Sequence, residues 1–287
     1  QFFNSFFVIT LFAPIRATNQ IGFMITKKEE LTALIITYNE IGYIEKCIES
    51  VSFADEIIVV DSFSTDGTFE FLKSHPKVKV IQNPFENFTA QKSFALKQAK
   101  NDWVLFLDAD EIVSDALQNE ITETVSSDTD IAAFWFYRQF MFKNEKLNYS
   151  GWQTDKNYRL FRKSKAVFSD CKIVHETLDV EGTSGILKEK LIHYCYKNYE
   201  DYKGKMLKYG RLKAVESFYK EKQYSYVMMV LKTGWKFFNH YILRLGILDG
   251  KKGFIICYLN SLGVLERYQE LKRLEQKNEL AYYLVMP

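Results

Sequence analysis

Cysteine is scarce in this sequence, and its spacing excludes two kinds of small scaffold. The 287 residues contain four cysteines, and none of them stands in a CxxC pair. The cysteines are Cys47, Cys171, Cys195 and Cys257. Neither a disulfide framework nor a zinc site is indicated, and we expect reduced thiols. The four histidines are equally sparse and show no HExxH or similar metal-binding spacing.

Strong charge and long apolar runs are also missing. The formal net charge is only +2, so no nucleic-acid partner is expected. The apolar run Gln1–Phe12 is shorter than the ~20 residues that a membrane-spanning helix needs. No basic segment precedes this run, which argues against a signal peptide. We treat residues 1–23 as an N-terminal extension of unknown role, because Met24 looks like a more natural start.

From Leu31 onward, short apolar runs alternate with helical segments that have polar faces. This alternation is typical of βαβ units and a mostly parallel sheet flanked by helices. The predicted strands are Leu31–Ile36, Glu56–Asp61, Val78–Ile81, Trp103–Leu107 and, as a further candidate, Ile131–Arg138. We therefore predict an α/β, Rossmann-like domain over residues 24–196. Ligands of such open sheets bind at the carboxyl ends of the strands.

After Tyr196 the sequence changes to long helical patterns rich in Tyr, Phe, Lys and Leu. Helices are predicted over residues 201–221, 224–245 and 253–275, within a helical tail that covers residues 197–287. The run Gly253–Leu265 is again too short to span a bilayer. The tail is therefore a second structural unit.

The middle of this tail combines aromatic and aliphatic residues with cations. Lys232, Lys236 and Arg244 stand among them within residues 224–245. Such a segment suits a helix that lies in a membrane interface, with its cations at anionic lipid. The alternative is a core helix packed on the first domain. We expect an anionic membrane surface as a partner.

Two aspartates end the last buried strand of the first domain. Asp108 and Asp110 are two positions apart, so in extended geometry their carboxylates point the same way. Such a pair can hold a divalent metal and neutralise a diphosphate. The alternative is a solvated acidic turn that caps the helix after Ser114.

Two further aspartates follow the second strand. Asp61 ends this strand, where its carboxylate can accept a hydrogen bond from the imide N–H of a uracil-like base. Asp66 stands before Gly67 and Thr68 and is a second candidate for donor binding. Each has a structural alternative: Asp61 can cap the serine-rich turn, and Asp66 can cap the next helix.

Several of these segments together resemble family 2 glycosyltransferases. They are Ile35–Glu40, Val60–Thr68, Ala90–Leu96, Leu107–Glu111, Gly151–Trp152, Tyr158–Arg162, Val174–Glu176 and Leu248–Gly250. More narrowly, the chain resembles the bacterial branch that adds glucose or a related sugar to the lipopolysaccharide core. The resemblance covers nearly everything from Leu31 to about Leu265, and the order and spacing of the segments make it specific.

This resemblance implies a GT-A fold, an inverting single displacement and a nucleotide-diphospho sugar as donor. It places Thr37, Glu40, Asp61 and Lys92 at the nucleoside or diphosphate. It places Asp110 as the main ligand of a divalent metal, Mn²⁺ or Mg²⁺. Taken by itself, Lys92 is more typical of a lysine on a helix surface.

An inverting transfer needs a base that takes the proton of the acceptor hydroxyl. In many family members this base is the second acid of a Glu-Asp pair, and Asp155 stands in the matching place. The preceding Glu is replaced by Thr154, which is a departure from the pattern. His175 and Glu176 are the other candidates for a catalytic or metal-binding role, against a structural histidine.

Two arginines follow the candidate base. Arg159 and Arg162 can form bidentate contacts with the diphosphate or with a phosphorylated acceptor. The alternative is pairing with surface acids, which is the commoner role of arginine.

The sequence thus predicts an inverting glycosyltransferase that acts on a glycan or lipid-linked acceptor, in the cytoplasm at the inner face of the cell membrane. A nucleotidyltransferase is one alternative, although no glycine-rich basic loop follows the first strand. A catalytically inactive nucleotide-binding scaffold of the same fold is another.

Overall fold

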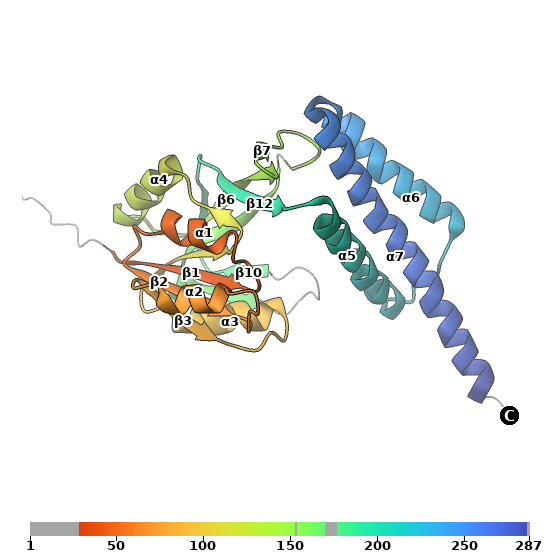
Figure 1. Cartoon of the computed structure of the whole chain (residues 1–287), viewed down its shortest axis with the longest axis horizontal. Coiled ribbons are helices and arrows are strands. Elements are labelled where there is room, and N and C mark those ends of the chain that lie inside the picture. The colour runs from red at the N-terminus through yellow and green to blue at the C-terminus, as the bar shows by residue number, and fades with distance from the viewer. Residues whose placement is uncertain (1–28, 153, 170–176, 286–287) are drawn as a thin grey trace, which may run out of the picture.

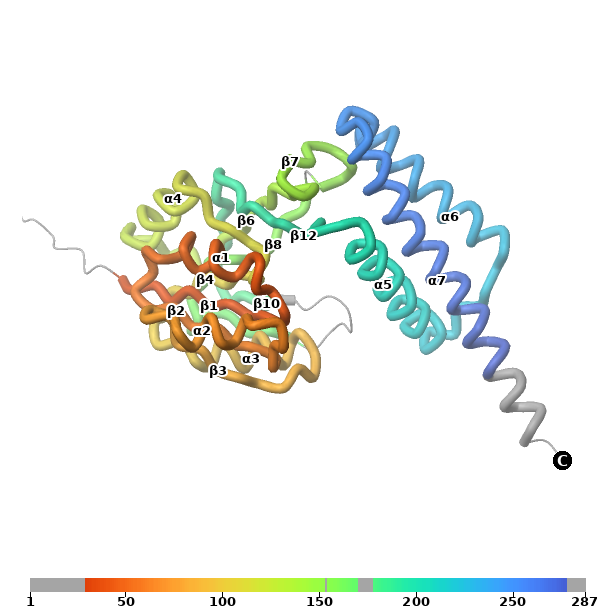
Figure 2. Tube along the Cα trace, in the orientation of Figure 1, coloured from red at the N-terminus to blue at the C-terminus, as the bar shows by residue number. Residues whose placement is uncertain are grey.

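The computed structural model describes residues 29–152, 154–169 and 177–285, which form an α/β domain joined to a helical extension (Figure 1). The predicted N-terminal extension, residues 1–23, lies outside the described residues. Figure 2 shows the chain leaving the sheet through β12 (Leu191–Tyr196) and entering α5 (Tyr199–Tyr219) of the extension.

A sheet of ten strands forms the centre of the domain, and five of its nine strand pairs are parallel. Four neighbouring strands run parallel to one another, in the spatial order β3 (Val78–Gln82), β2 (Glu56–Asp61), β1 (Leu31–Thr37) and β4 (Trp103–Asp108). All seven residues of β1 are buried, because helices cover both faces of the sheet at this point. The carboxyl ends of these strands therefore share one edge.

Four helices cover the two faces of the parallel strands. They are α1 (Ile44–Ser50), α2 (Thr68–Ser74), α3 (Phe88–Gln98) and α4 (Asp115–Ser126). Helices α1, α2 and α4 pack in one apolar cluster with alternate residues of β1, and α3 packs on the opposite face. Ser114, and not the acidic turn of Asp108 and Asp110, caps α4, since its hydroxyl accepts from Leu117 N–H at 3.3 Å.

Beyond β4 the sheet continues with both antiparallel and parallel pairs. Strand β8 (Lys156–Arg162) lies between β4 and β6 (Ile131–Phe142) and runs antiparallel to both. The sheet continues through β12 to β5 (Glu111–Ile112). The remaining strands are β7 (Glu145–Lys146) and β11 (Thr183–Ile186) on β6, and a separate ladder of β9 (Ala166–Ser169) with β10 (Thr177–Val180) after a 3₁₀ turn at Lys163–Lys165. Because β8 is antiparallel to β4, its amino end lies at the carboxyl end of β4.

The extension consists of three long helices. After α5 come α6 (Tyr226–Phe238), a π-helical turn at Asn239–Leu243, a 3₁₀ turn at Gly246–Asp249 and α7 (Gly250–Val285). Helices α5 and α7 approach closely at two glycines. A Cβ at Gly210 would lie 2.5 Å from the carbonyl oxygen of Gly263, so only glycine permits this spacing.

The extension is tied to the α/β domain through the carboxylate of Asp249. Its oxygens accept from the backbone N–H groups of Asn148 at 3.0 Å and Tyr149 at 2.9 Å, and from the Ser150 hydroxyl at 3.3 Å. Asp249 is buried, so these hydrogen bonds satisfy a charge that would otherwise be costly. The segment Leu248–Gly250 thus joins the two parts of the chain.

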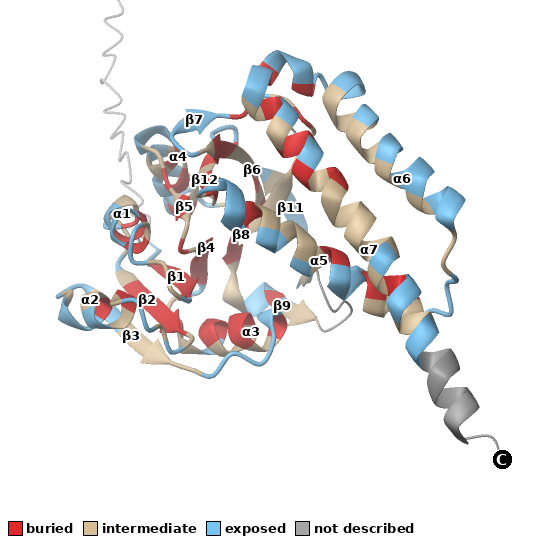
Figure 3. Cartoon of the chain, turned by 45° about the vertical axis from the view of Figure 1, so that its right-hand side comes forward, coloured by how far each residue is buried: buried red, intermediate tan, exposed pale blue. Residues whose placement is uncertain are grey.

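Helix α6 differs from its neighbours because it has no buried residue. Figure 3 shows it as the outermost helix, largely exposed or half-buried, whereas α5 and α7 carry buried positions. None of the helices within the described residues combines the length and the apolar character needed to cross a bilayer.

The structure confirms the predicted α/β fold with a mostly parallel sheet and a C-terminal helical extension. The first four strands start at the predicted residues. One helix is shorter than predicted: the pattern over 224–245 becomes α6 and a separate π-helical turn. Shortly after this turn, Leu245 adopts a φ of 57°, which lies outside the right-handed helical region. The helix therefore cannot continue into Gly246.

Candidate active site

Three predicted site residues reach the same edge of the sheet because neighbouring strands end in register. Thr37 pairs with Asp61, and Ile36 pairs with Asp108. Strands β1, β2 and β4 run parallel, so their last residues open on one edge, where ligands of such sheets bind. The edge is therefore the candidate active site.

Asp61 supports the turn that follows β2. Its fully buried carboxylate accepts from Ser64 N–H at 3.0 Å, from the Ser64 hydroxyl and from Gln82 Nε2 at 3.2 Å. The predicted capping alternative is thus part of its role. Contact with a nucleotide base stays a prediction.

Asp66 links the loops after β1 and β2. Its carboxylate accepts from Thr68 N–H at 3.1 Å, from Thr68 Oγ1 at 2.6 Å and from Ile41 N–H at 3.2 Å. Burial raises the pKa of Asp66, but these hydrogen bonds outweigh burial and hold the pKa below its usual value. The carboxylate therefore positions both loops in its ionised form.

The loop after β1 carries two of the predicted donor-binding residues. Thr37 is buried, and its hydroxyl has no hydrogen-bond partner among the described residues. Glu40 is paired with Lys197, which follows β12. Burial raises the pKa of Glu40 above its usual value, and the pairing with Lys197 only partly offsets this effect. A buried hydroxyl without a partner is unusual, and contact of Thr37 with the donor stays a prediction.

Lys92 is a buried residue of α3 and not the surface lysine that its helix alone would suggest. Its ammonium lies 5.3 Å from the centroid of the Phe106 ring on β4. Its charge also helps to lower the pKa of Asp108. Lys92 therefore places a positive charge under the end of β4, where a diphosphate would need one.

Asp108, Glu111 and Arg159 form an ionic group in which Glu111 and Arg159 are buried and Asp108 is partly exposed. Arg159 Nη2 donates to Asp108 Oδ2 at 2.7 Å and to Glu111 Oε1 at 2.5 Å. Glu111 also accepts from Asp108 N–H at 3.1 Å. Burial raises the pKa of Asp108, but the Arg159 guanidinium outweighs burial and holds the pKa well below its usual value. Asp108 is therefore ionised and fixed in orientation.

Asp110 faces His193, a residue of β12. The Nε2 atom of His193 lies 3.4 Å from Asp110 Oδ1, and its Nδ1 atom is buried without a hydrogen-bond partner in the described parts of the chain. Burial raises the pKa of Asp110, yet the imidazole outweighs it and lowers the pKa to about 2. Asp110 thus supplies a carboxylate and His193 a ring nitrogen at one point.

The residues at this point fit a divalent metal that binds together with a diphosphate. Within the described ranges, no three His, Cys, Asp or Glu side chains are arranged to hold a metal by themselves. Mg²⁺ typically takes one or two carboxylates and completes its coordination with substrate phosphates and water. Asp108 and Asp110 offer two such carboxylates, so the diphosphate and water would supply the remaining ligands.

Asp155, the predicted base, is paired with an arginine. Arg138 Nε donates to Asp155 Oδ2 at 2.6 Å, and Arg138 Nη1 lies 3.5 Å from Glu111 Oε1. The Asp155 side chain is 34% exposed, so a substrate hydroxyl can still reach it. Arg138 thus connects the candidate base to the ionic group around Asp108.

The other predicted residues divide into two groups. Arg162 lies at the opposite end of β8, where it stacks on Trp103 at 4.4 Å and pairs with Glu29 at 3.0 Å. Of its predicted alternatives, the surface pairing is therefore the one present. His175 and Glu176 lie outside the described residues, so their roles stay predictions.

Sequence reasoning did not single out His193, Glu111, Arg138 or Lys197. His193 meets the site only because β12 pairs with β5, where His193 stands opposite Glu111. A local pattern cannot show such a pairing. Glu111 did carry a signal in the sequence, because it directly follows Asp110. The structure shows that it is fully buried.

Comparisons with known proteins agree with this geometry. A family model described as Glycosyl transferase family 2 matches residues 32–180. An uncharacterized glycosyltransferase of Rickettsia bellii is 31% identical over 262 residues, covering 88% of each chain. The lipopolysaccharide core biosynthesis glycosyltransferase LpsC of Rhizobium meliloti is 26% identical over 253 residues, which cover 84% of this chain and 94% of LpsC.

Among solved structures, S. aureus TarS 1–349 in complex with UDP covers 86% of this chain and 92% of its own, with 14% identity and a TM-score of 0.45. The family assignment rests on the sequence matches, which span half of the chain for the family model and most of it for the relatives. The chain belongs to glycosyltransferase family 2.

Proposed function

We propose that this glycosyltransferase moves a sugar, with inversion, from a nucleotide-diphospho sugar to a hydroxyl of a glycan or lipid-linked acceptor of the lipopolysaccharide core type. The observation that carries the proposal is the pairing of Asp110 with His193 beside the ionic group of Asp108, at the end of parallel strands. The relative LpsC, which is named for lipopolysaccharide core biosynthesis, supports the acceptor class.

The donor would lie along the edge formed by the loops after β1, β2 and β4. Thr37 and Glu40 would meet the nucleoside, and Asp61 the base, with Asp66 holding the two loops in place. Lys92 supplies positive charge near the diphosphate. Arg159 fixes Asp108 in its ionised form and adds charge behind it.

Asp108 and Asp110 would hold the divalent metal, Mn²⁺ or Mg²⁺, together with the diphosphate of the donor. When bound, the metal would neutralise the negative charge that grows on the departing nucleoside diphosphate. The carboxylates of Asp108 and Asp110 are already ionised and are held by Arg159 and His193, so little reorganisation is needed during the transfer.

Asp155 would take the proton of the acceptor hydroxyl while the oxygen of that hydroxyl attacks the anomeric carbon of the donor sugar. The bond from that carbon to the diphosphate oxygen breaks on the opposite side, which inverts the configuration. Arg138 holds the carboxylate in one orientation through its contacts with Asp155 and Glu111. A positioned carboxylate contributes about 10²–10⁴-fold as a general base.

The exposed apolar residues of α6 would rest on the inner face of the cell membrane, near a lipid-linked acceptor. Val227 is 63% exposed, Leu231 60% and Trp235 56%. Residues at this spacing lie on one side of a helix, as in helices that lie in a lipid interface. The proposed location is therefore the cytoplasmic surface of the membrane.

Thermal unfolding with a panel of nucleotides tests this function. A nucleoside diphosphate with Mn²⁺ or Mg²⁺ should raise the melting temperature, because a ligand that binds only the folded state stabilises it. Stronger stabilisation by a triphosphate would instead favour a nucleotidyltransferase. Stabilisation without sugar transfer to any acceptor would favour an inactive scaffold.

A further inference from the structure

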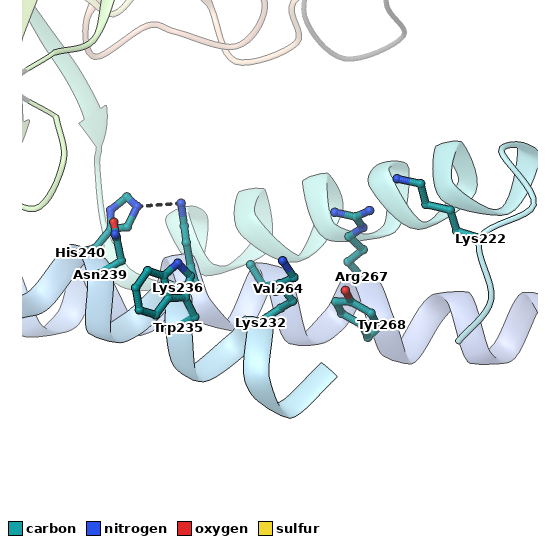
Figure 4. A pocket seen from close by; sticks show the side chains of 9 residues that line it. All are labelled: Lys222, Lys232, Trp235, Lys236, Asn239, His240, Val264, Arg267 and Tyr268. Atoms are coloured by element: carbon teal, nitrogen blue, oxygen red, sulfur yellow. Dashed lines mark hydrogen bonds between the residues drawn. The ribbon is translucent and has the colours of Figure 1, made fainter. Parts of the chain in front are cut away.

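A cavity of about 540 Å³ lies in the helical extension, away from the candidate active site (Figure 4). Lys232, Trp235 and Lys236 line it from α6, Arg267 and Tyr268 from α7, and Lys222 from the segment after α5. These six residues are called the cationic groove below. Its lining combines four cations with two aromatic rings.

The positive charge of the cationic groove is not neutralised locally. Within the described ranges, no carboxylate lies at ion-pair distance from the charged groups of Lys222, Lys232, Lys236 or Arg267. Glu216 of α5 feels the charge of Arg267, but its ion pair is with Lys220. The groove therefore attracts an anion.

Lys236 is held by a neutral partner. The Nδ1–H group of His240 donates to the carbonyl oxygen of Ser150 at 2.7 Å, so Nε2 is left to accept from Lys236 Nζ at 2.9 Å. Burial and the charge of Lys236 lower the pKa of His240 to about 4, which keeps the ring neutral. Burial, together with the cations Lys213 and Arg244, lowers the pKa of Lys236. An anionic ligand would relieve this repulsion.

The same helix carries the exposed apolar side beside the groove. Val227, Leu231 and Phe238 lie on one side of α6, and Trp235 stands at its border with Lys232. If the apolar side enters the interface of a bilayer, Lys232 and Lys236 come to the level of the head groups. Binding of a free anion from solution would leave this apolar side exposed to water.

We propose that the cationic groove binds the phosphate group of an anionic membrane lipid while the apolar side of α6 lies in the lipid interface. The proposal rests on the membrane contact proposed above, and it is independent of the donor site. The ligand class is a phosphate ester at a bilayer surface, held by ammonium and guanidinium donors.

Sedimentation of the full chain with vesicles tests the proposal. One set of vesicles contains phosphatidylcholine alone, and the other contains phosphatidylglycerol in addition. We expect binding to rise with the anionic lipid and to fall with salt. The variant K232Q/K236Q/R267Q should lose about 100-fold in affinity for the anionic vesicles, as three cations at such a surface predict.

A matched variant separates the groove from general attraction. K146Q/K188Q/K190Q removes the same charge from exposed positions of the α/β domain and should bind almost as the unaltered chain does. An equal loss in both variants would overturn the proposal. So would a thermal shift with inorganic phosphate that vanishes in the groove variant while no vesicle binding occurs, because the site would then serve a free anion.

Stabilisation by UDP with Mn²⁺, measured on the same groove variant, reports on the donor site. Unchanged stabilisation together with lost vesicle binding supports the groove as a separate lipid site. Equal vesicle binding by the groove variant and the unaltered chain would refute the groove while leaving the proposed glycosyl transfer intact.

Discussion

The ammonium group of Lys197 is paired with the carboxylate of Glu40, which lies 157 positions earlier in the chain. Lys197 also lies over the ring of Tyr43 at 4.8 Å. The pair joins the segment that leads into the helical extension to the loop that follows β1. The extension therefore begins at a contact with the candidate donor site.

We expect this pair to couple the extension to donor binding. The variants K197M and E40Q should each weaken the binding of UDP with Mn²⁺. The double variant should weaken it less than the sum of both, with a coupling free energy of about 1 kcal/mol. Titration calorimetry on the unaltered chain and the three variants measures the cycle. Strictly additive effects would show that the pair has no influence on the donor.

Substitution of Asp110 by alanine should remove the metal-dependent part of donor binding and leave the fold intact. Asp110 lies at the edge of the sheet, and its partner His193 remains in β12. The Mn²⁺-dependent rise in melting temperature with UDP reports the change. D128A, at an exposed position after α4, is the control. Full Mn²⁺-dependent stabilisation of D110A would refute the metal assignment.

The variant D155N should lower turnover by about 10²–10⁴-fold with donor affinity nearly unchanged, as expected for loss of a general base. Asparagine keeps the size of the side chain and still accepts a hydrogen bond from Arg138, so the local structure should persist. Steady-state kinetics combined with UDP titration separates the two effects. Near-normal turnover would mean that Glu176 or another acid is the general base.

Replacement of glycine by alanine should have opposite effects at two positions of α5, because only Gly210 lies against α7. G210A places a Cβ 2.5 Å from the Gly263 carbonyl oxygen and should destabilise the chain by about 1–2 kcal/mol. G204A has open space on the same helix and should stabilise by about 0.5–1 kcal/mol. Denaturant unfolding of both variants checks the prediction. Stabilisation by G210A would mean that the helices lie farther apart.

Acid should destabilise the junction at His240. Burial and the charge of Lys236 lower the pKa of His240 from 6.5 to about 4. Between these values the unfolded chain binds a proton that the folded chain does not, so stability falls as the pH falls. After a discount for partial exposure, the loss between pH 7 and pH 5 should be about 1 kcal/mol. The variant H240Q should show a smaller loss over this range, and an identical loss would exclude His240.

Local patterns predicted the elements of the parallel sheet with small errors. The apolar run at Leu31 is a strand because it is buried on both faces, and the aspartates Asp61 and Asp108 end their strands as predicted. These features depend on neighbours in the sequence. The helical extension was predicted for the same reason, since its periodicity is local.

The partners of these residues could not be predicted, because they come from strands far along the chain. His193 reaches Asp110 through the pairing of β12 with β5, and Arg159 reaches Asp108 because β8 is antiparallel to β4. Single positions such as Lys92 were ambiguous until burial was known. Arg159 stands in the middle of β8 and Arg162 at its carboxyl end, a difference in position that the sequence alone does not show.

The hydrogen bonds of Asp249 determine when, during synthesis, the loop at Asn148 and Tyr149 can complete its structure. The N–H groups of Asn148 and Tyr149 obtain their acceptor from a residue about 100 positions later. At a synthesis rate of about 5–20 residues per second, the loop waits about 5–20 s for this acceptor. The nascent α/β domain thus carries an unfinished loop until α6 has been made, and this interval is when a chaperone or a nearby membrane can act on the chain.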